Sequence, residues 1–303
     1  MQAESYRLLL SIFYPIFFVV SLIAQLFLLF LIIKHSPKSI HMLRIILGMT
    51  CIFQIILAFS SSFVQIRFVT SAKPIEMWSY GLCRQFEPWV CYCFYQTEQL
   101  SALASALTIY GTFYLKYRMV KGVMMNKWEI TKTYTMFYFP LVLSSILVFI
   151  IIKTQTFSWE SQEHLRLVNA FLYNGQDYIA IAVLSFSKWP NTLNLKTLKQ
   201  IYHQLENMSA PRQTLYKSFI MGLSVQCALP YIFYVPIYTL YYYCLITGRE
   251  VLFLEFFLTL VPAIPAAIDP IISVYFVTPF RKKLLRWIKK EREEIRSNSA
   301  FTK

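Results

Sequence analysis

Two carboxylates of this sequence lie inside long apolar stretches, where a charge is costly. Glu98 follows an aromatic run, and Asp269 directly precedes Pro270. A charged side chain near the centre of a bilayer costs about 2.5–3.5 kcal/mol on insertion scales, so such residues usually face a protein interior and mark functional sites. Glu98 could pair with a cationic ligand, bond to neighbouring amides and tyrosine hydroxyls, or face a water-filled vestibule. Asp269 could satisfy backbone groups that nearby prolines leave free.

Other patterns that carry chemistry are missing from the sequence. It contains no Gly-rich phosphate loop, no HExxH and no GxSxG, and its four histidines are scattered in loops. The six cysteines do not have the spacing of a zinc site. We therefore expect no enzyme, no catalytic residue, no metal and no cofactor.

The composition predicts that these carboxylates belong to membrane helices. Hydrophobic residues make up 57% of the chain and charged residues only 15%, with a mean hydropathy of +0.49. Such a chain lacks the polar residues that would cover a soluble domain. Its apolar blocks reach 18 residues or more, the length at which a helix spans about 30 Å of hydrocarbon.

We predict an all-α, seven-transmembrane helix bundle over residues 1–277, followed by a cytosolic amphipathic helix and tail over residues 278–303. The predicted spans cover residues 8–33, 43–69, 89–114, 136–152, a segment within 167–186, 219–246 and 251–277. In this arrangement Arg67 snorkels outward at the end of the second span. Glu255, one turn into the seventh span, is expected to be an interfacial residue.

The fifth span is weak. Between Lys153 and Lys217 the longest uncharged apolar run covers residues 178–186, and nine residues of helix reach only about 14 Å. A longer segment that starts at Leu167 places the polar residues 174–177 in mid-membrane. An incomplete fifth span, with six stable spans, is the alternative.

The distribution of positive charge favours a crossing. The net charge is +14, and 22 of the 29 Lys and Arg residues lie on one side of the membrane if the fifth segment crosses. This is the positive-inside pattern, which places the N-terminus outside and the C-terminus in the cytosol. The same clustering in alternate loops argues against a nucleic-acid partner.

Three separated stretches resemble the nematode serpentine receptors of class delta, which are distantly rhodopsin-like. The run from Ser79 to Tyr92, SYGLCRQFEPWVCY, resembles the family pattern SYGxCRxxGPxxCY, with Glu87 in place of Gly. Met208-Ser209 and the run over residues 223–230 resemble MSxxT…LxxQxxLP. The run from Asp269 to Arg281 resembles DPIIxIYFxxPYR, with Phe280 in place of Tyr.

The resemblance implies a chemosensory G-protein-coupled receptor in the plasma membrane of sensory cilia. Its partners would be a small odorant or pheromone-like ligand, a heterotrimeric G protein and membrane lipids. We place the ligand in the outer half of the bundle, with four candidate contacts: Glu98, Tyr238, Tyr241 and Tyr242. The tyrosines could instead form an aromatic belt at the membrane interface.

The resemblance also implies an activation switch around the sixth and seventh spans, with four candidates: Arg118, Pro230, Asp269 and Pro270. Arg118 stands where rhodopsin-like receptors carry the Arg of DRY, but no acid precedes it here. An ordinary positive-inside anchor is the alternative for this residue.

Four cysteines lie near the outer, oxidising face: Cys83, Cys91, Cys93 and Cys244. We expect one disulfide among them, with Cys83 the best candidate, although the sequence does not fix its partner.

The segment after Pro279 has the pattern of a membrane-surface helix. One helical face carries Phe280, Leu284, Leu285 and Ile288, and the rest is basic. A calmodulin target has the same pattern and is the alternative.

Two other classes of function remain for the whole chain. One is a degenerate, non-signalling receptor paralogue. The other is a ligand-gated channel with its N-terminus inside, which the distribution of Lys and Arg argues against.

Overall fold

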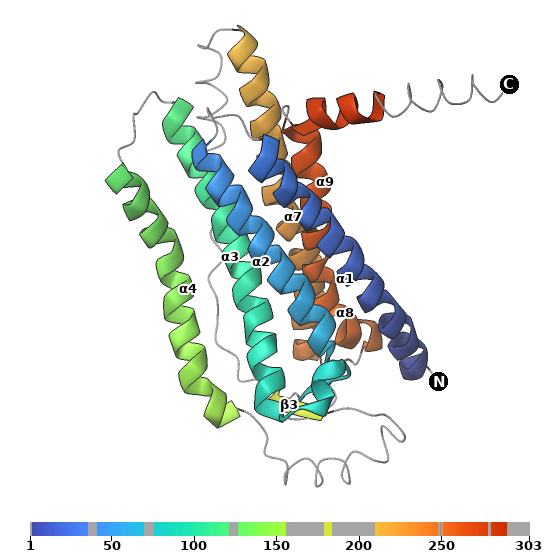
Figure 1. Ribbon diagram of the computed structural model, residues 1–303. Helices are drawn as coiled ribbons and strands as arrows, with labels where there is room; N and C mark the ends of the chain where they lie inside the picture. Colours follow the sequence, from blue (N-terminus) through green and yellow to red (C-terminus); the bar gives the residue numbers. More distant parts are fainter. Residues whose placement is uncertain are drawn as a thin grey trace, which may run out of the picture.

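The protein is a bundle of long helices capped by a small β-sheet at one end (Figure 1). The computed structural model describes residues 2–35, 41–69, 76–120, 127–155, 179–183, 210–247, 249, 251–277 and 280–289. The helices are α1 (Gln2–His35), α2 (His41–Val64), α3 (Pro88–Val120), α4 (Lys127–Gln155), α7 (Ala210–Thr247), α8 (Leu252–Ala263) and α9 (Pro265–Phe276). The shorter elements are β1 (Ile66–Val69), β2 (Glu76–Ser79), β3 (Ile179–Val183) and the 3-10 helix η2 (Leu82–Gln85).

Several helices bury polar side chains among the apolar ones of the core and expose large apolar side chains on the outer surface. On α1, Ser21 and Gln25 are fully buried, whereas Ile16, Ile23 and Ile33 are more than half exposed. A soluble helix would expose the polar residues and bury the isoleucines, so this arrangement requires an apolar solvent. By length and composition, the described residues contain three helices that are able to cross a membrane: Ser5–Lys34, Arg44–Val64 and Leu252–Phe276. The predicted spans 89–114, 136–152 and 219–246 also lie in helices, within α3, α4 and α7.

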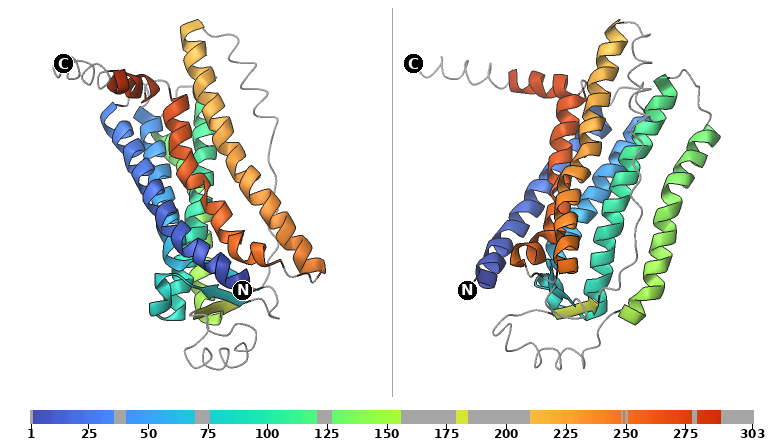
Figure 2. Two further views of the ribbon diagram at one scale, coloured as in Figure 1. Left: turned by 90° about the vertical axis from the view of Figure 1, so that its right-hand side faces the viewer. Right: turned by 180° about the vertical axis from the view of Figure 1, so that it is seen from behind.

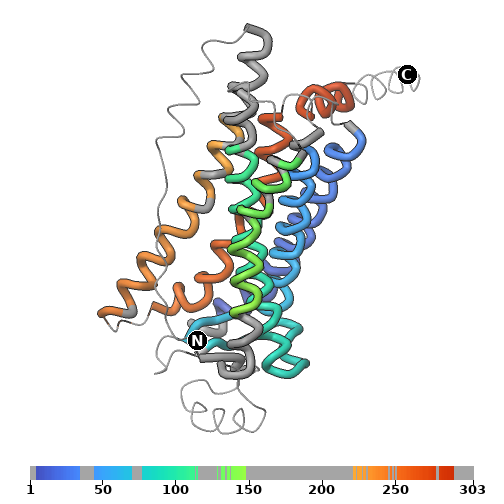
Figure 3. Tube along the Cα trace, turned by 90° about the vertical axis from the view of Figure 1, so that its left-hand side faces the viewer, coloured from blue at the N-terminus to red at the C-terminus, as the bar shows by residue number. Residues whose placement is uncertain are grey.

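The two ends of the bundle differ. Residue 2, the β-sheet and η2 lie at one end, called here the sheet end. A helix over residues 280–289 lies at the other end, called here the tail end, and runs roughly perpendicular to the bundle helices (Figure 2). Inside the bundle, α2 packs against α1 and α3, while α9 packs against α1 and α7. Helix α4 packs on the outer side of α3 (Figure 3).

The predicted seventh span is divided into two helices. Helix α8 ends at Ala263 and α9 begins at Pro265, with Ile264 as the junction. Pro265 has no backbone N–H and cannot continue the hydrogen-bond ladder of α8. The Ile264 amide instead bonds to the Val261 carbonyl at 3.2 Å, which closes the last turn.

The predicted second span is too long by five residues. Helix α2 ends at Val64 because Gln65 has a φ of 47°, a left-handed conformation that stops a helix. Residues 66–69 then form β1, an antiparallel partner of β2, with Ile66 opposite Ser79 and Val69 opposite Glu76. Hydropathy alone does not distinguish this buried strand from a continuing helix.

The prediction of a fifth membrane helix is wrong for residues 179–183, which form β3. This strand pairs antiparallel with β2, with Ile179 opposite Ser79 and Val183 opposite Glu76. The apolar run is too short for a crossing, its Ile and Val residues favour a strand, and the edge of β2 offers unpaired backbone groups. Strand β3 lies at the sheet end, and α7 begins at the tail end (Figures 1 and 2). The rest of the predicted fifth span lies outside the described residues.

Candidate functional site

Glu98 is buried inside the bundle, toward its sheet end. It lies on α3, ten residues after the first residue of this helix, and only 3% of it is exposed. Ten residues of helix correspond to about 15 Å, so Glu98 lies well below the sheet. Among the described residues, no Lys, Arg or His forms a salt bridge with it.

Hydroxyl groups from two other helices surround Glu98. The Ser61 hydroxyl of α2 lies beside the carboxyl group, and the Tyr14 phenol of α1 lies within electrostatic range of it. Both residues are 1% exposed. The Ser61 hydroxyl lies within hydrogen-bonding reach of both the Glu98 carboxyl group and the Tyr14 phenol, and the phenol also lies within reach of Thr259. The carboxyl group and the two hydroxyls therefore lie close together in the interior of the bundle.

Three further tyrosines complete this cluster. Tyr95 lies one turn before Glu98 on α3, while Tyr234 and Tyr238 come from α7, and all three phenols are within electrostatic range of Glu98. The rings of Tyr234 and Tyr238 meet edge to face, with centroids 6.3 Å apart. The term Glu98 cluster is used below for Glu98 with Ser61, Tyr14, Tyr95, Tyr234 and Tyr238.

The structure separates the tyrosines that were predicted as ligand contacts. Tyr238 belongs to the Glu98 cluster. Tyr241 is buried one turn further toward the sheet, where its ring contacts Phe68 of β1 with centroids 6.3 Å apart. Tyr242 is 50% exposed, as expected of a residue on the outer surface of the bundle. Tyr14 and Tyr234 were not predicted as site residues. Each carries a polar hydroxyl within an apolar stretch, which is a signal visible in the sequence.

A buried ion pair above the Glu98 cluster was also missed. Arg67 of β1 and Glu255 of α8 are 1% and 3% exposed, and the Nη2 and Nε atoms of Arg67 donate to Oε2 of Glu255 at 2.7 and 2.9 Å. Arg67 also donates to the Tyr80 hydroxyl at 3.3 Å and lies over the Phe256 ring, 4.6 Å from its centroid. Arg67 therefore does not snorkel outward, and Glu255 is not a solvated interfacial residue.

The ion pair keeps Arg67 charged. Burial acts to lower the pKa of Arg67, but the neighbouring Tyr80 and Glu255 outweigh it, and the pKa lies above its ordinary value. The hydropathy pattern placed Arg67 at a span end and gave no sign of its partner, because the two residues are far apart in the sequence. The pair joins the sheet to the start of the seventh span.

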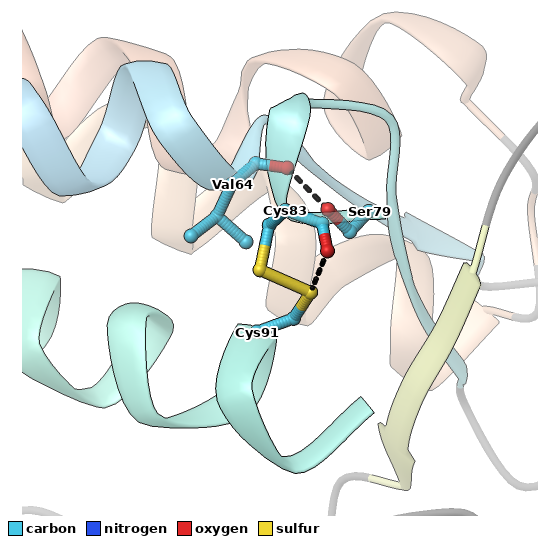
Figure 4. Close-up of a disulfide and its surroundings, with 4 residues drawn as sticks. All are labelled: Val64, Ser79, Cys83 and Cys91. Atoms are coloured by element: carbon cyan, nitrogen blue, oxygen red, sulfur yellow. Dashed lines mark hydrogen bonds between the residues drawn. A yellow bond between two sulfur atoms is a disulfide. The ribbon is translucent and has the colours of Figure 1, made fainter. Parts of the chain in front are cut away.

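A disulfide and close backbone packing hold the sheet against the helices. Cys83 of η2 is bonded to Cys91 of α3, and the Ser79 hydroxyl donates to the Val64 carbonyl at 2.6 Å (Figure 4). Gly81 lies so close to the end of α2 that a Cβ atom there would collide with the backbone of Phe63. Of the other predicted cysteines, Cys93 and Cys244 are free thiols.

A second polar group of residues lies in the interior, around Asp269 of α9. Gln54 of α2 donates to Oδ2 of Asp269 and accepts a hydrogen bond from Gln25 of α1 at 2.5 Å. Gln25 also donates to the Ala266 carbonyl at 2.6 Å, one turn before Asp269. The other carboxylate oxygen, Oδ1, has no partner among the described residues.

This group extends to α7 and to a small cavity. Gln226 donates to the Ser273 hydroxyl at 2.8 Å and to the Asp269 carbonyl at 3.4 Å. A cavity of about 10 Å³, close to the smallest that can hold one water, lies beside Asp269. Its polar lining comes from Thr50, Gln54, Thr112, Gln226, Asp269 and Ser273. We call these residues, with Gln25, the Asp269 network. The amides of the network were missed, although a glutamine in the middle of an apolar span is a recognisable signal.

The remaining predicted residues are placed as follows. Arg118 lies in α3 and Pro230 in α7, but their side chains are outside what the structure describes. Pro270 is buried in α9 beside Asp269. In the helix over residues 280–289, Phe280 is buried and Leu284 is half-buried, whereas Leu285 and Ile288 are exposed.

The bundle and its sites define a class of protein. Several helices with an apolar exterior enclose two buried polar clusters beneath a disulfide-linked sheet. The Glu98 cluster lies toward the sheet end, and the Asp269 network lies further toward the tail end. This arrangement is that of a multi-helix membrane protein with buried polar groups in its interior, and its described residues contain no group of His, Cys, Asp or Glu that could hold a metal ion.

Comparison with known proteins gives the family. A family model described as "Serpentine type 7TM GPCR chemoreceptor Srd" matches residues 10–286. The Caenorhabditis elegans protein "Serpentine receptor class delta-40" is 38% identical, with 97% of each chain covered. "Serpentine receptor class delta-44" and "Serpentine receptor class delta-45" from the same organism are 31% and 30% identical, with at least 95% of each chain covered. The chain belongs to the Srd family of serpentine seven-transmembrane chemoreceptors.

The family membership confirms the resemblance that the three sequence stretches indicated. The protein is an integral membrane protein of a GPCR-type chemosensory family, which is a class of receptors and not of enzymes.

Proposed function

We propose that the protein is a chemosensory G-protein-coupled receptor that binds a small molecule at the Glu98 cluster. The observation that supports this most directly is a buried carboxylate that has no cationic partner among the described residues and lies beside the hydroxyls of Ser61 and Tyr14. Burying such polar groups costs free energy, and interactions with a bound ligand would offset this cost. Tyr238 is a direct contact in this proposal, while Tyr241 supports the sheet above the site and Tyr242 faces lipid.

Signal transmission is assigned to the Asp269 network. This network joins the first, second, sixth and seventh spans through side-chain amides. Pro270 and Pro230 weaken the ladders of α9 and α7, which allows these helices to shift. A ligand that favours one arrangement of these hydrogen bonds would change the position of α7 at the tail end, where we place the G protein and Arg118.

The proposed orientation places the sheet end outside the cell and the tail end in the cytosol, in the plasma membrane of sensory cilia. The helix over residues 280–289 would then lie on the anionic inner leaflet, with Leu285 and Ile288 in the lipid and the basic residues at the headgroups. A non-signalling paralogue is the second candidate, because residues 179–183 form β3 in place of the expected apolar helix.

G-protein activation tests this function. Cells that express the receptor with a G-protein activation reporter are exposed to volatile and water-soluble odorant fractions, and the response is compared with that of Asp269→Ala and of Arg118→Ala. We expect the wild type to respond, and each variant to lose most of the response at equal surface expression. A response that both variants retain in full would remove the switch assignment. A wild type that reaches the surface and activates no G protein with any fraction would favour the non-signalling paralogue.

A further inference from the structure

Two acids near the sheet end, Glu255 and Glu98, are equally buried but differ in whether a described cation pairs with the carboxylate. Glu255 and Glu98 are both 3% exposed. Glu255 receives two hydrogen bonds from Arg67, whose guanidinium is also held over an aromatic ring. Glu98 has no such partner among the described residues. One acid therefore has a cation as its partner, and the other has none in the part of the chain that the structure describes.

The surroundings of Glu98 have the chemistry of a cation site. An ammonium group has three N–H donors and no acceptor. The Glu98 carboxylate, the Ser61 Oγ atom and the Tyr14 phenol oxygen can accept these three hydrogen bonds, because Ser61 lies within hydrogen-bonding reach of both Glu98 and Tyr14. Tyr95, Tyr234 and Tyr238 add aromatic rings, which attract cations through their π faces.

The cluster also limits the size and polarity of a ligand. Its members come from α1, α2, α3 and α7 and are buried or half-buried, so the ligand must be small. The hydrophobic residues that pack around Tyr95 and Tyr238 include Ile237, Tyr92 and Leu258, which suit an alkyl or aryl group next to the charge. A second charge on the ligand would find no opposite charge there among the described residues.

From this arrangement we infer that the ligand is a small protonated amine. Its ammonium group would pair with Glu98 as the guanidinium group of Arg67 pairs with Glu255. The inference rests on the proposed ligand site, and names the chemical class of molecule that the site recognises. A simple alkylamine is protonated at neutral pH, as a lysine side chain is.

Binding to the purified receptor tests the inference without any G protein. The probes are propylamine, 3-methylbutylamine, 2-phenylethylamine and tetramethylammonium at pH 7. Their effect on the thermal unfolding temperature in detergent is compared with that of sodium chloride at equal ionic strength and of 3-methylbutan-1-ol, the neutral analogue of 3-methylbutylamine. We expect at least one cation to raise the unfolding temperature of the wild type in a saturable manner, and the alcohol to have no such effect.

The variants separate recognition by charge from a structural role. Glu98→Gln keeps the shape of the side chain and should weaken amine binding at least about tenfold, because it removes the only carboxylate of the cluster. Glu87→Gln makes the same chemical change at an exposed position and should bind as the wild type does. Tyr238→Leu should weaken binding more than Tyr238→Phe, which keeps the aromatic ring.

Two results would overturn the inference. One is a folded wild type that none of the four cations stabilises beyond the salt control. The other is amine binding that Glu98→Gln leaves unchanged, which would make Glu98 a structural residue and place the amine elsewhere. A receptor that binds amines through Glu98 but activates no G protein would keep the inference and remove only the signalling proposal.

Discussion

At the scale of single residues, the buried pair of Arg67 and Glu255 is the interaction most sensitive to substitution. Removing one partner leaves the other charged and without its counter-ion in an apolar setting, which costs about 3–5 kcal/mol. We therefore expect both Arg67→Met and Glu255→Gln to lower the unfolding temperature of the purified receptor. The double substitution Arg67→Met with Glu255→Leu should recover part of this loss, because no uncompensated charge remains. Single variants as stable as the wild type would contradict the pairing.

The Asp269 network makes a second prediction at this scale. Gln54→Leu has nearly the same volume as the native residue but leaves both carboxylate oxygens of Asp269 without a donor in the described structure. The expected cost is about 1–3 kcal/mol. Gln54→Leu combined with Asp269→Leu should be less destabilised than Gln54→Leu alone, in thermal unfolding measured in detergent. If the double variant is the less stable of the two, the amide and the carboxylate do not interact.

At the scale of elements, the disulfide fixes η2 on the start of α3. It closes a loop with a sequence separation of 8, for which the loop-entropy model gives about 2–3 kcal/mol. We expect Cys83→Ser to lower the unfolding temperature, and a reducing agent to lower that of the wild type equally. Cys93→Ser changes a free, half-buried thiol and is the matched control. Peptide mapping under non-reducing conditions gives a direct check, since a linkage of Cys83 to Cys93 or Cys244 would disprove the pairing.

The approach of α7 to α9 depends on one glycine. A Cβ atom at Gly222 would collide with the side chain of Phe276. Gly222→Ala should therefore push α7 away from α9 in the half of the bundle nearer the tail end, and either destabilise the receptor or shift its basal signalling. The double variant Gly222→Ala with Phe276→Gly removes the Cβ atom of Phe276, which the added methyl group would meet first, and should reverse the effect. Gly48, where a Cβ atom meets nothing closer than 3.9 Å, is the control position for an alanine substitution.

At the scale of the whole molecule, the orientation in the membrane is open to a direct test. We expect an epitope tag at the N-terminus to be accessible on intact cells, and a tag at the C-terminus to be accessible only after permeabilisation. This result requires an odd number of crossings, and therefore one crossing in addition to the six predicted spans that lie in described helices. Two exposed tags would mean that this crossing is absent and that the protein is a degenerate receptor. A hidden N-terminus with an exposed C-terminus would favour a channel of inverted topology.

Much of the architecture could be predicted from the sequence, because membrane helices are recognised by length and hydropathy alone. The helices α1, α3, α4 and α7 contain the spans expected at these positions. The prediction was wrong at the end of the second span and at residues 179–183. Both are short apolar runs, in which a helix and a buried strand have the same hydropathy and only the pairing with β2 decides between them.

The sequence by itself indicated a membrane receptor of the Srd type, with Glu98 and Asp269 inside apolar spans where a charge is costly. Both conclusions follow from local properties: the length of apolar segments, charges within them, and three family motifs. The tertiary structure decided which partners these acids have. It joined Arg67 to Glu255 over 188 positions in the sequence and Gln54 to Asp269 over 215, and it surrounded Glu98 with hydroxyls from α1 and α2. Such contacts arise only when distant helices pack side by side, so no pattern within a single segment could reveal them.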